Sequence, residues 1–150
     1  MTHKEEALRS FDKGFNCSQS VLGAFCEEFG MKQETAFKIA TGFGGGMRRA
    51  EVCGAVTGAI MAIGLKIGQC VEGDNTTKTQ AYETTNQFED RFEQLNGSII
   101  CRNILRYDLT KPEELAVIRE KGLFDTVCTK AIADAVALVE EILGLEVKPG

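Results

Sequence analysis

Residues 42–58 read GFGGGMRRAEVCGAVTG, a glycine-rich and basic loop that runs into an apolar helix. Four glycines in five positions break regular structure, and apolar residues then continue at helical spacing through position 65. The helix expected over about residues 51–68 is apolar on nearly every side, which is typical of a helix in the centre of a bundle. The stretch therefore predicts an all-α bundle around one central helix, with Cys53 at the entrance of that helix.

Amphipathic segments on both sides of this stretch predict the surrounding helices. Asn16 and Gln19 match a capping box at the start of a helix that ends near Gly30. Gly54 and Gly58 lie four residues apart in the central helix and predict close packing against a neighbour. Other helices are expected to end near Gly14, Gly42, Gly97, Gly122 and Gly144. No strand alternation or internal repeat interrupts this pattern, so residues 1–150 are expected to form a single all-α domain.

Three finer expectations concern the ends of helices and the faces that they bury. A long helix should follow the polar residues 72–78. One face of this helix carries a seam of residues at near-heptad spacing, which should pack either within the chain or against a second copy of it. That seam consists of Ala81, Thr85, Phe88, Phe92 and Leu95. Ser98 should cap a short helix that contains Cys101, Pro112 should open the next helix, and the last helix should run over about residues 124–143. His3, the only histidine, is expected at a frayed terminus.

Composition and charge limit the kinds of molecule that the chain is expected to bind and the places where it is expected to lie. The net charge is −5, the isoelectric point is near 5.0, and lysines and arginines are scattered among acidic residues, so nucleic acid is excluded as an expected partner. The longest apolar run is shorter than the roughly 20 residues that a bilayer requires, which predicts no membrane span. The first residues lack the pattern of an export signal, so a cytoplasmic location is expected.

Four of the six cysteines fall at or near expected helix starts. These are Cys17, Cys53, Cys101 and Cys128. The positive end of the helix dipole stabilises a thiolate at such positions and lowers its pKa. Without an export signal, this pattern favours redox or metal chemistry over structural disulfides. Cys26 lies in the middle of a helix and Cys70 follows the central helix, so both are interpreted as bystanders.

The chain resembles the family of small redox-active proteins named for a C_GCAxxG_C_C pattern. The resemblance rests on FNCSQSVL around Cys17, on GFGGGMRRAEVCGAVTGAIMAIGL around Cys53, on NGSIICR ending in Cys101 and Arg102, and on Cys128 in the final helix. The sequence here has the CGAxxG form of the motif, in VCGAVTG. The resemblance covers nearly the whole chain and implies thiol redox activity.

A thiol-disulfide oxidoreductase is the first functional hypothesis. One low-pKa cysteine attacks a disulfide or oxidant, and a second cysteine resolves the mixed disulfide. Cys53 is the expected attacking thiol, because Arg48 and Arg49 in the loop before it add positive charge. Cys17 is the first candidate for the resolving thiol and Cys101 the second. The redox partner or small-molecule substrate is unknown at this point, and no cofactor is required.

Two alternative functions stay open, and the glycine-rich loop could in addition form an anion-binding site. The four thiolates could hold zinc or an iron-sulfur cluster, although the ligands do not form the usual CxxC pairs. The chain could also be a helical interaction module without catalysis. The amide groups of Gly44, Gly45 and Gly46, with Arg48, Arg49 and the start of the central helix, could bind an anionic substrate.

Overall fold

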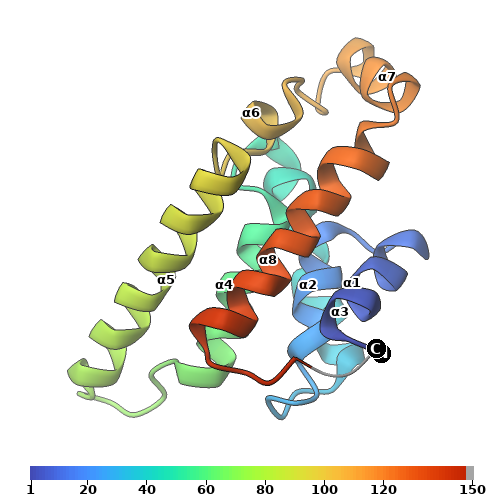
Figure 1. Cartoon of the computed structure of the whole chain (residues 1–150). Coiled ribbons are helices and arrows are strands. Elements are labelled where there is room, and N and C mark those ends of the chain that lie inside the picture. Colours follow the sequence, from blue (N-terminus) through green and yellow to red (C-terminus); the bar gives the residue numbers. More distant parts are fainter. Residues whose placement is uncertain (148–150) are drawn as a thin grey trace.

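The computed structural model describes residues 1–147, which form eight α-helices, α1 to α8, and three shorter segments, η1 to η3 (Figure 1). The α-helices span His3–Asp12 (α1), Cys17–Phe25 (α2), Gln33–Ala40 (α3), Gly54–Ile67 (α4), Asn75–Asn96 (α5), Cys101–Leu105 (α6), Pro112–Glu120 (α7) and Thr129–Ile142 (α8). The shorter segments span Thr41–Phe43 (η1), Gly46–Ala50 (η2) and Phe124–Cys128 (η3). None of these residues belongs to a β-strand, and the predicted all-α class is confirmed.

Helix α4 occupies the centre of the bundle and packs against α2, α5 and α8. Its buried residues are small or β-branched, and they form one core with the apolar faces of its neighbours. They include Ala55, Val56, Ala59, Ala62 and Ile63, none of which is exposed to solvent. The predicted central helix is therefore confirmed, but it begins at Gly54 and not near Glu51. The cause is an extended segment before Gly54, which pairs with a distant part of the chain as described below.

The two glycines of the CGAxxG motif set the distance between α2 and α4. A Cβ atom added to Gly58 would lie 2.6 Å from the carbonyl oxygen of Ser18, and one added to Gly54 would lie 3.0 Å from the Cβ of Cys17. Side chains at these positions would therefore push the two helices apart. The predicted close approach is confirmed, and it brings the first turn of α2 against the first turn of α4.

Capping interactions fix the starts of the first two helices. Asn16 and Gln19 form the predicted capping box of α2. Thr2 and Glu5 form a second capping box at the start of α1. This second box begins α1 at His3 and removes His3 from solvent. The expectation of a frayed N-terminus at His3 is therefore wrong.

His3 is part of the core at the end of the molecule where the N-terminus lies. Its ring stacks on Phe25 with a centroid distance of 4.5 Å. Its Nδ1 lies 2.8 Å from a carboxylate oxygen of Glu140, and its Nε2 lies 3.4 Å from a carboxylate oxygen of Glu28. These contacts tie the start of α1 to α2 and α8.

Two expected helix starts are displaced. The cap of α6 is Ile100, while the hydroxyl of Ser98 accepts a hydrogen bond of 3.0 Å from the amide of Ile100 one residue before that helix. Helix α5 starts at Asn75, inside the stretch expected to be a polar turn, because Asp74 caps it by accepting a bond from the amide of Thr77. Within the chain, the seam of α5 is only partly buried: Phe88 and Phe92 are its buried residues, and Leu95 is half exposed.

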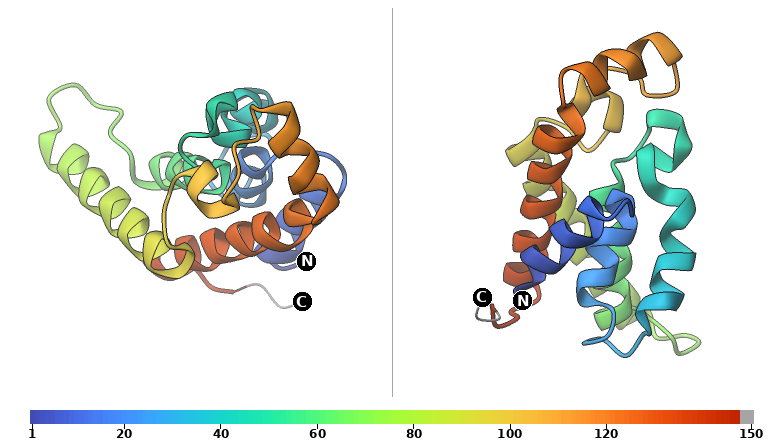
Figure 2. Two further views of the ribbon diagram at one scale, coloured as in Figure 1. Left: turned by 90° about the horizontal axis from the view of Figure 1, so that it is seen from above. Right: turned by 90° about the vertical axis from the view of Figure 1, so that its right-hand side faces the viewer.

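One end of the bundle is built from short elements. Helices α6 and α7 and segment η3 gather at the end opposite the N-terminus, above η2 (Figures 1 and 2). Helix α5 diverges from the bundle as seen from above, so that its first turns point away from the other helices (Figure 2). Across residues 1–147, no helix combines the length and apolarity needed to cross a bilayer.

Candidate functional site

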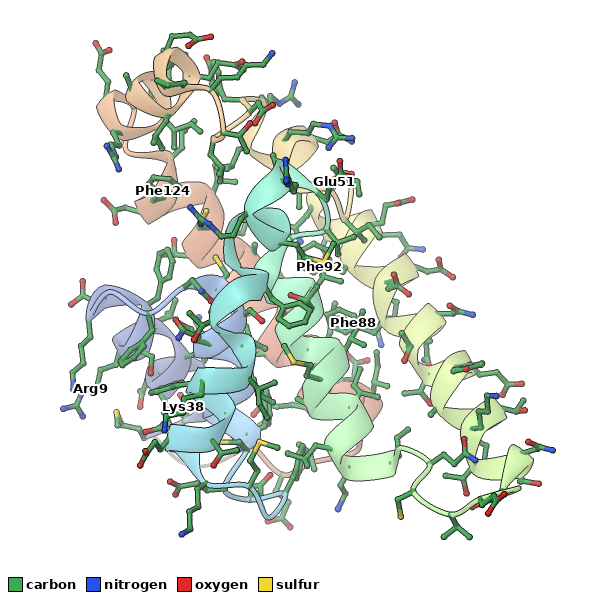
Figure 3. All side chains as sticks on the ribbon, turned by 180° about the vertical axis from the view of Figure 1, so that it is seen from behind. Arg9, Lys38, Glu51, Phe88, Phe92 and Phe124 are labelled. Carbon is green, nitrogen blue, oxygen red and sulfur yellow. The ribbon has the colours of Figure 1, made fainter. Side chains whose placement is uncertain are left out.

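A cavity of about 270 Å³ lies where α6, α7 and η3 meet the starts of α2 and α4. The four cysteines selected from the sequence, Cys17, Cys53, Cys101 and Cys128, all line it. Phe124, on η3, also lines the cavity, and Figure 3 shows it at the same end of the molecule as Glu51, which precedes α4. Residues far apart in the chain are thus brought to one space.

The glycine-rich loop reaches this space through a left-handed turn. The φ angles of Gly45, Gly46, Met47 and Arg48 are 63°, 64°, 59° and 63°, and that of Ala50 is 55°. Glycine adopts this region freely, but each of the other residues costs about 1–2 kcal/mol there. The turn is closed by a hydrogen bond of 3.0 Å from the amide of Glu51 to the carbonyl of Gly46. Strain of this kind persists only where surrounding contacts hold the backbone.

The extended residues after the turn place Cys53 beside Cys101. Val52 and Ile100 form an isolated antiparallel bridge. Next to it, the amide of Cys53 donates to the carbonyl of Ile99 at 2.8 Å, and the amide of Cys101 donates to the carbonyl of Glu51 at 2.6 Å. This pairing explains why α4 starts at Gly54, with Cys53 as its cap.

Arg102 reinforces the same pairing. Its guanidinium donates to the carbonyl of Ala50 at 3.0 Å and to the carboxylate of Glu51 at 2.8 Å. Gly46 lies against Cys101, since a Cβ atom on Gly46 would be 3.0 Å from the Cβ of Cys101 and 2.3 Å from the amide nitrogen of Glu51. Both cysteines are therefore held by backbone contacts and are 7% exposed.

Cys17 is held at the first position of α2 by the capping residue before it. The side-chain amide of Asn16 donates to the carbonyl of Thr41 at 2.9 Å, and the side chain of Gln19 donates to the carbonyl of Phe37 at 3.0 Å. Gly44 is buried against Asn16, and a Cβ atom there would lie 2.3 Å from the side chain of Asn16. The capping box thus anchors the start of α2 under the glycine-rich loop.

The thiols of Cys17 and Cys128 both line the cavity, and hydrogen bonding between them has the largest effect on the pKa of each. This bond lowers the pKa of Cys128, the acceptor, below its ordinary value, although burial opposes the change. The same bond raises the pKa of Cys17, the donor, well above its ordinary value, and burial and the sulfurs of Cys128, Cys53 and Cys101 add to the rise. Of the two thiols, Cys128 therefore loses its proton first.

Cys53 and Cys101 are thiols at neutral pH. Burial raises the pKa of Cys53 to about 11, and this outweighs the hydrogen bonds from the amides of Ala55 and Val56 at the start of α4. Burial raises the pKa of Cys101 to about 12, with Arg48 only partly opposing it. The expectation of a low pKa for Cys53 is therefore wrong, because desolvation exceeds the stabilisation from the helix start.

The remaining predicted residues divide between the cavity and its surroundings. Gly45 and Arg48 line the cavity, whereas Gly44 and Gly46 are buried behind it, and Arg49 is exposed and does not line it. Both bystander cysteines lie elsewhere: Cys26 is buried in the main core and Cys70 is exposed after α4.

Sequence reasoning missed the side chains that residues 104–124 contribute to the cavity. These are Ile104 and Leu105 of α6, Leu109 of the following loop, Leu115 and Arg119 of α7, and Phe124 of η3. The only signal for them was their proximity in sequence to Cys101 and Cys128, because α7 is a short helix of ordinary amphipathic composition.

The tetrathiolate alternative finds no ready geometry in this arrangement. Within residues 1–147, no three or more side chains of His, Cys, Asp and Glu are grouped so that they could hold a metal ion. All six cysteines are free thiols. The cavity is lined instead by two thiols that shift each other's pKa, Cys17 and Cys128, and by two buried thiols, Cys53 and Cys101.

Comparisons with known proteins agree with the four-cysteine pattern. A family model with the description "Putative redox-active protein (C_GCAxxG_C_C)" matches residues 15–142, which include all four cavity cysteines. Neither a search of curated proteins nor one of solved structures gives a match to this chain.

Proposed function

Because the chain belongs to the C_GCAxxG_C_C family of redox-active proteins, we propose that it is a thiol-disulfide oxidoreductase whose redox pair is Cys17 and Cys128. The observation that carries this proposal is that both thiols line one cavity, where each has the largest effect on the pKa of the other. A disulfide requires two sulfurs at one place, and the mutual effect of these two thiols gives them different pKa values.

Cys128 is the attacking nucleophile in this proposal. Its thiolate attacks one sulfur of a disulfide R–S–S–R, which breaks the S–S bond, forms a mixed disulfide with Cys128 and releases R–S⁻. Cys17 then transfers its proton to the released thiolate, and its own thiolate attacks the sulfur of Cys128. The second R–S⁻ leaves and a Cys17–Cys128 disulfide forms. The protein loses two electrons and R–S–S–R gains them.

The high pKa of Cys17 suits the second step. A thiol with a raised pKa stays protonated until the negative charge on Cys128 is removed by formation of the mixed disulfide. The hydrogen bond that raised the pKa of Cys17 is then lost, so its ionisation becomes easier. Cys53 and Cys101 remain protonated during this cycle at neutral pH. No cofactor takes part in either step.

Alkylation of the reduced protein over a pH series, read by peptide mass, tests the proposal. Alkylation follows the thiolate fraction, so at neutral pH we expect Cys128 to be labelled first, with a midpoint below the ordinary thiol value of about 8.5. Labelling of Cys53 should have a midpoint near 11 and that of Cys101 near 12. After oxidation by a small disulfide at neutral pH, the cross-linked peptides should join Cys17 to Cys128.

Replacement of Cys17 tests whether this residue is what lowers the pKa of Cys128. Cys17→Ala removes the hydrogen bond to Cys128, so the labelling midpoint of Cys128 should move to higher pH, whereas Cys26→Ala should leave it unchanged. A midpoint of Cys128 that equals or exceeds that of Cys53 contradicts the proposal. So does a stoichiometric metal ion, found by elemental analysis, that is lost when all four cavity cysteines are replaced.

A further inference from the structure

The charged side chains that line the cavity are both cationic. Arg48 comes from the left-handed turn and Arg119 from the last turn of α7, and no Asp or Glu of the described residues lines the cavity with them. Within residues 1–147, neither guanidinium forms an ion pair or a side-chain hydrogen bond, in contrast to Arg91 and Arg102. The chain has a net charge of −5, so a cavity whose charged side chains are all cationic has the opposite sign of charge to the chain as a whole.

The backbone directs Arg48 to the mouth of the cavity. The φ angle of Arg48 is 63°, and its guanidinium folds back over Gly45, where a Cβ atom would lie 2.7 Å from Nη1. Gly45 therefore leaves room for the guanidinium as well as for the turn. Non-glycine residues are held in this backbone region mainly where a function requires it.

Apart from Asn16, the glycines and the four cysteines, the rest of the wall is apolar. It is formed by Phe11, Ile104, Leu105, Leu109, Leu115 and Phe124. A volume of about 270 Å³ is at the lower end of ligand pockets and fits a compact body such as one aromatic ring. The cavity thus combines an apolar interior, cations at its rim and thiols in its wall.

We infer that this cavity binds a small organic disulfide that carries a carboxylate or another anionic group, with its apolar body against Leu115 and Phe124 and its anion between Arg48 and Arg119. The inference rests on the proposed function and names the class of its substrate. The electron balance is that given above, with R–S–S–R an anionic, low-molecular-weight disulfide. Guanidinium groups pair well with carboxylates, and this pairing orients the disulfide toward Cys128.

Two chromogenic disulfides that carry one aromatic ring on each sulfur separate the anion site from the thiol chemistry. Dithiobis(nitrobenzoate) carries a carboxylate on each ring, whereas dithiodipyridine is neutral at neutral pH. The experiment measures the single-turnover rate of reduced protein with each reagent at low ionic strength. Its readout is the ratio of the anionic to the neutral rate. For Arg48→Gln and Arg119→Gln we expect this ratio to fall about threefold each, and about tenfold in the double variant, because exposed pairs contribute modestly.

Arg9→Gln is the matched control, because it makes the same change in net charge on an exposed part of α1 that does not line the cavity. Its ratio should stay within about twofold of the wild-type value. An unchanged ratio in the double variant overturns the inference and leaves the proposed function standing. An equal slowing with both reagents also overturns it, since the arginines would then act on the thiols themselves. If wild-type protein reacts with dithiodipyridine no faster than an unfolded cysteine peptide, the proposed function fails and the inference fails with it.

Discussion

The two ends of α2 carry the same residue type in opposite environments. Cys17, at the first position of the helix, lies beside a cavity and shares a hydrogen bond with Cys128. Cys26, just past the last residue, is completely buried in the main core, where its thiol donates only to the carbonyl of Gly23 at 3.5 Å. Burial raises the pKa of both.

The difference lies in what surrounds each sulfur. At the end of Cys26 the sulfur is completely buried among core side chains, and the ring of His3 is likewise completely buried. At the end of Cys17 the helix starts, the left-handed turn and α7 enclose an open space beside a second thiol. On the proposed function, reactivity would follow from a cavity and a sulfur neighbour more than from a position at a helix end.

The largest expected effect comes from removing the nucleophile at the cavity end. Cys128→Ser replaces a thiolate with a hydroxyl that is not ionised near neutral pH, so the rate of reaction with dithiodipyridine at pH 7 should fall at least about a hundredfold. Stopped-flow absorbance of the released thione gives this rate. A residual rate above about a third of the wild-type rate would show that another cysteine attacks first.

The second effect acts on the packing that holds Cys17 at the cavity. In Gly58→Ala the new Cβ atom would meet the backbone of Ser18, one residue after Cys17, so the free energy of unfolding should fall by about 2 kcal/mol. Gly64→Ala, in the same helix, meets nothing within 4 Å and should raise the free energy of unfolding by up to about 1 kcal/mol. Urea denaturation measures both, and equal changes in the two variants would refute the close-packing account.

The sequence predicted the features that depend on neighbouring residues. The capping box of Asn16 and Gln19, the apolar character of α4 and the close approach at Gly54 and Gly58 are all confirmed. Each depends on interactions over a few residues or on a helical period, so the local sequence contains the information. The capping box of Thr2 and Glu5 had the same kind of signal, and overlooking it led to the wrong expectation for His3.

The features that depend on distant contacts were not predictable in this way. The bridge between Val52 and Ile100 delays the start of α4, and the positive φ angles of Met47 and Arg48 occur in residue types that rarely adopt them. A low pKa was expected for Cys53 because a helix start and nearby arginines are visible in sequence, whereas the depth of burial is not. The hydrogen bond between Cys17 and Cys128 exists only once η3 is folded against α2.

The smallest effect is expected at the other end of α2. Cys26→Ser keeps a hydroxyl donor within reach of the carbonyl of Gly23, but it places a more polar group in the core, so the free energy of unfolding should fall by about 1 kcal/mol. The rate with dithiodipyridine at pH 7 should stay within about twofold of the wild-type rate, because Cys26 lies outside the cavity. A tenfold loss of rate would mean that the core around Cys26 opens during the reaction, and a closed core and an open cavity would then no longer distinguish the two cysteines.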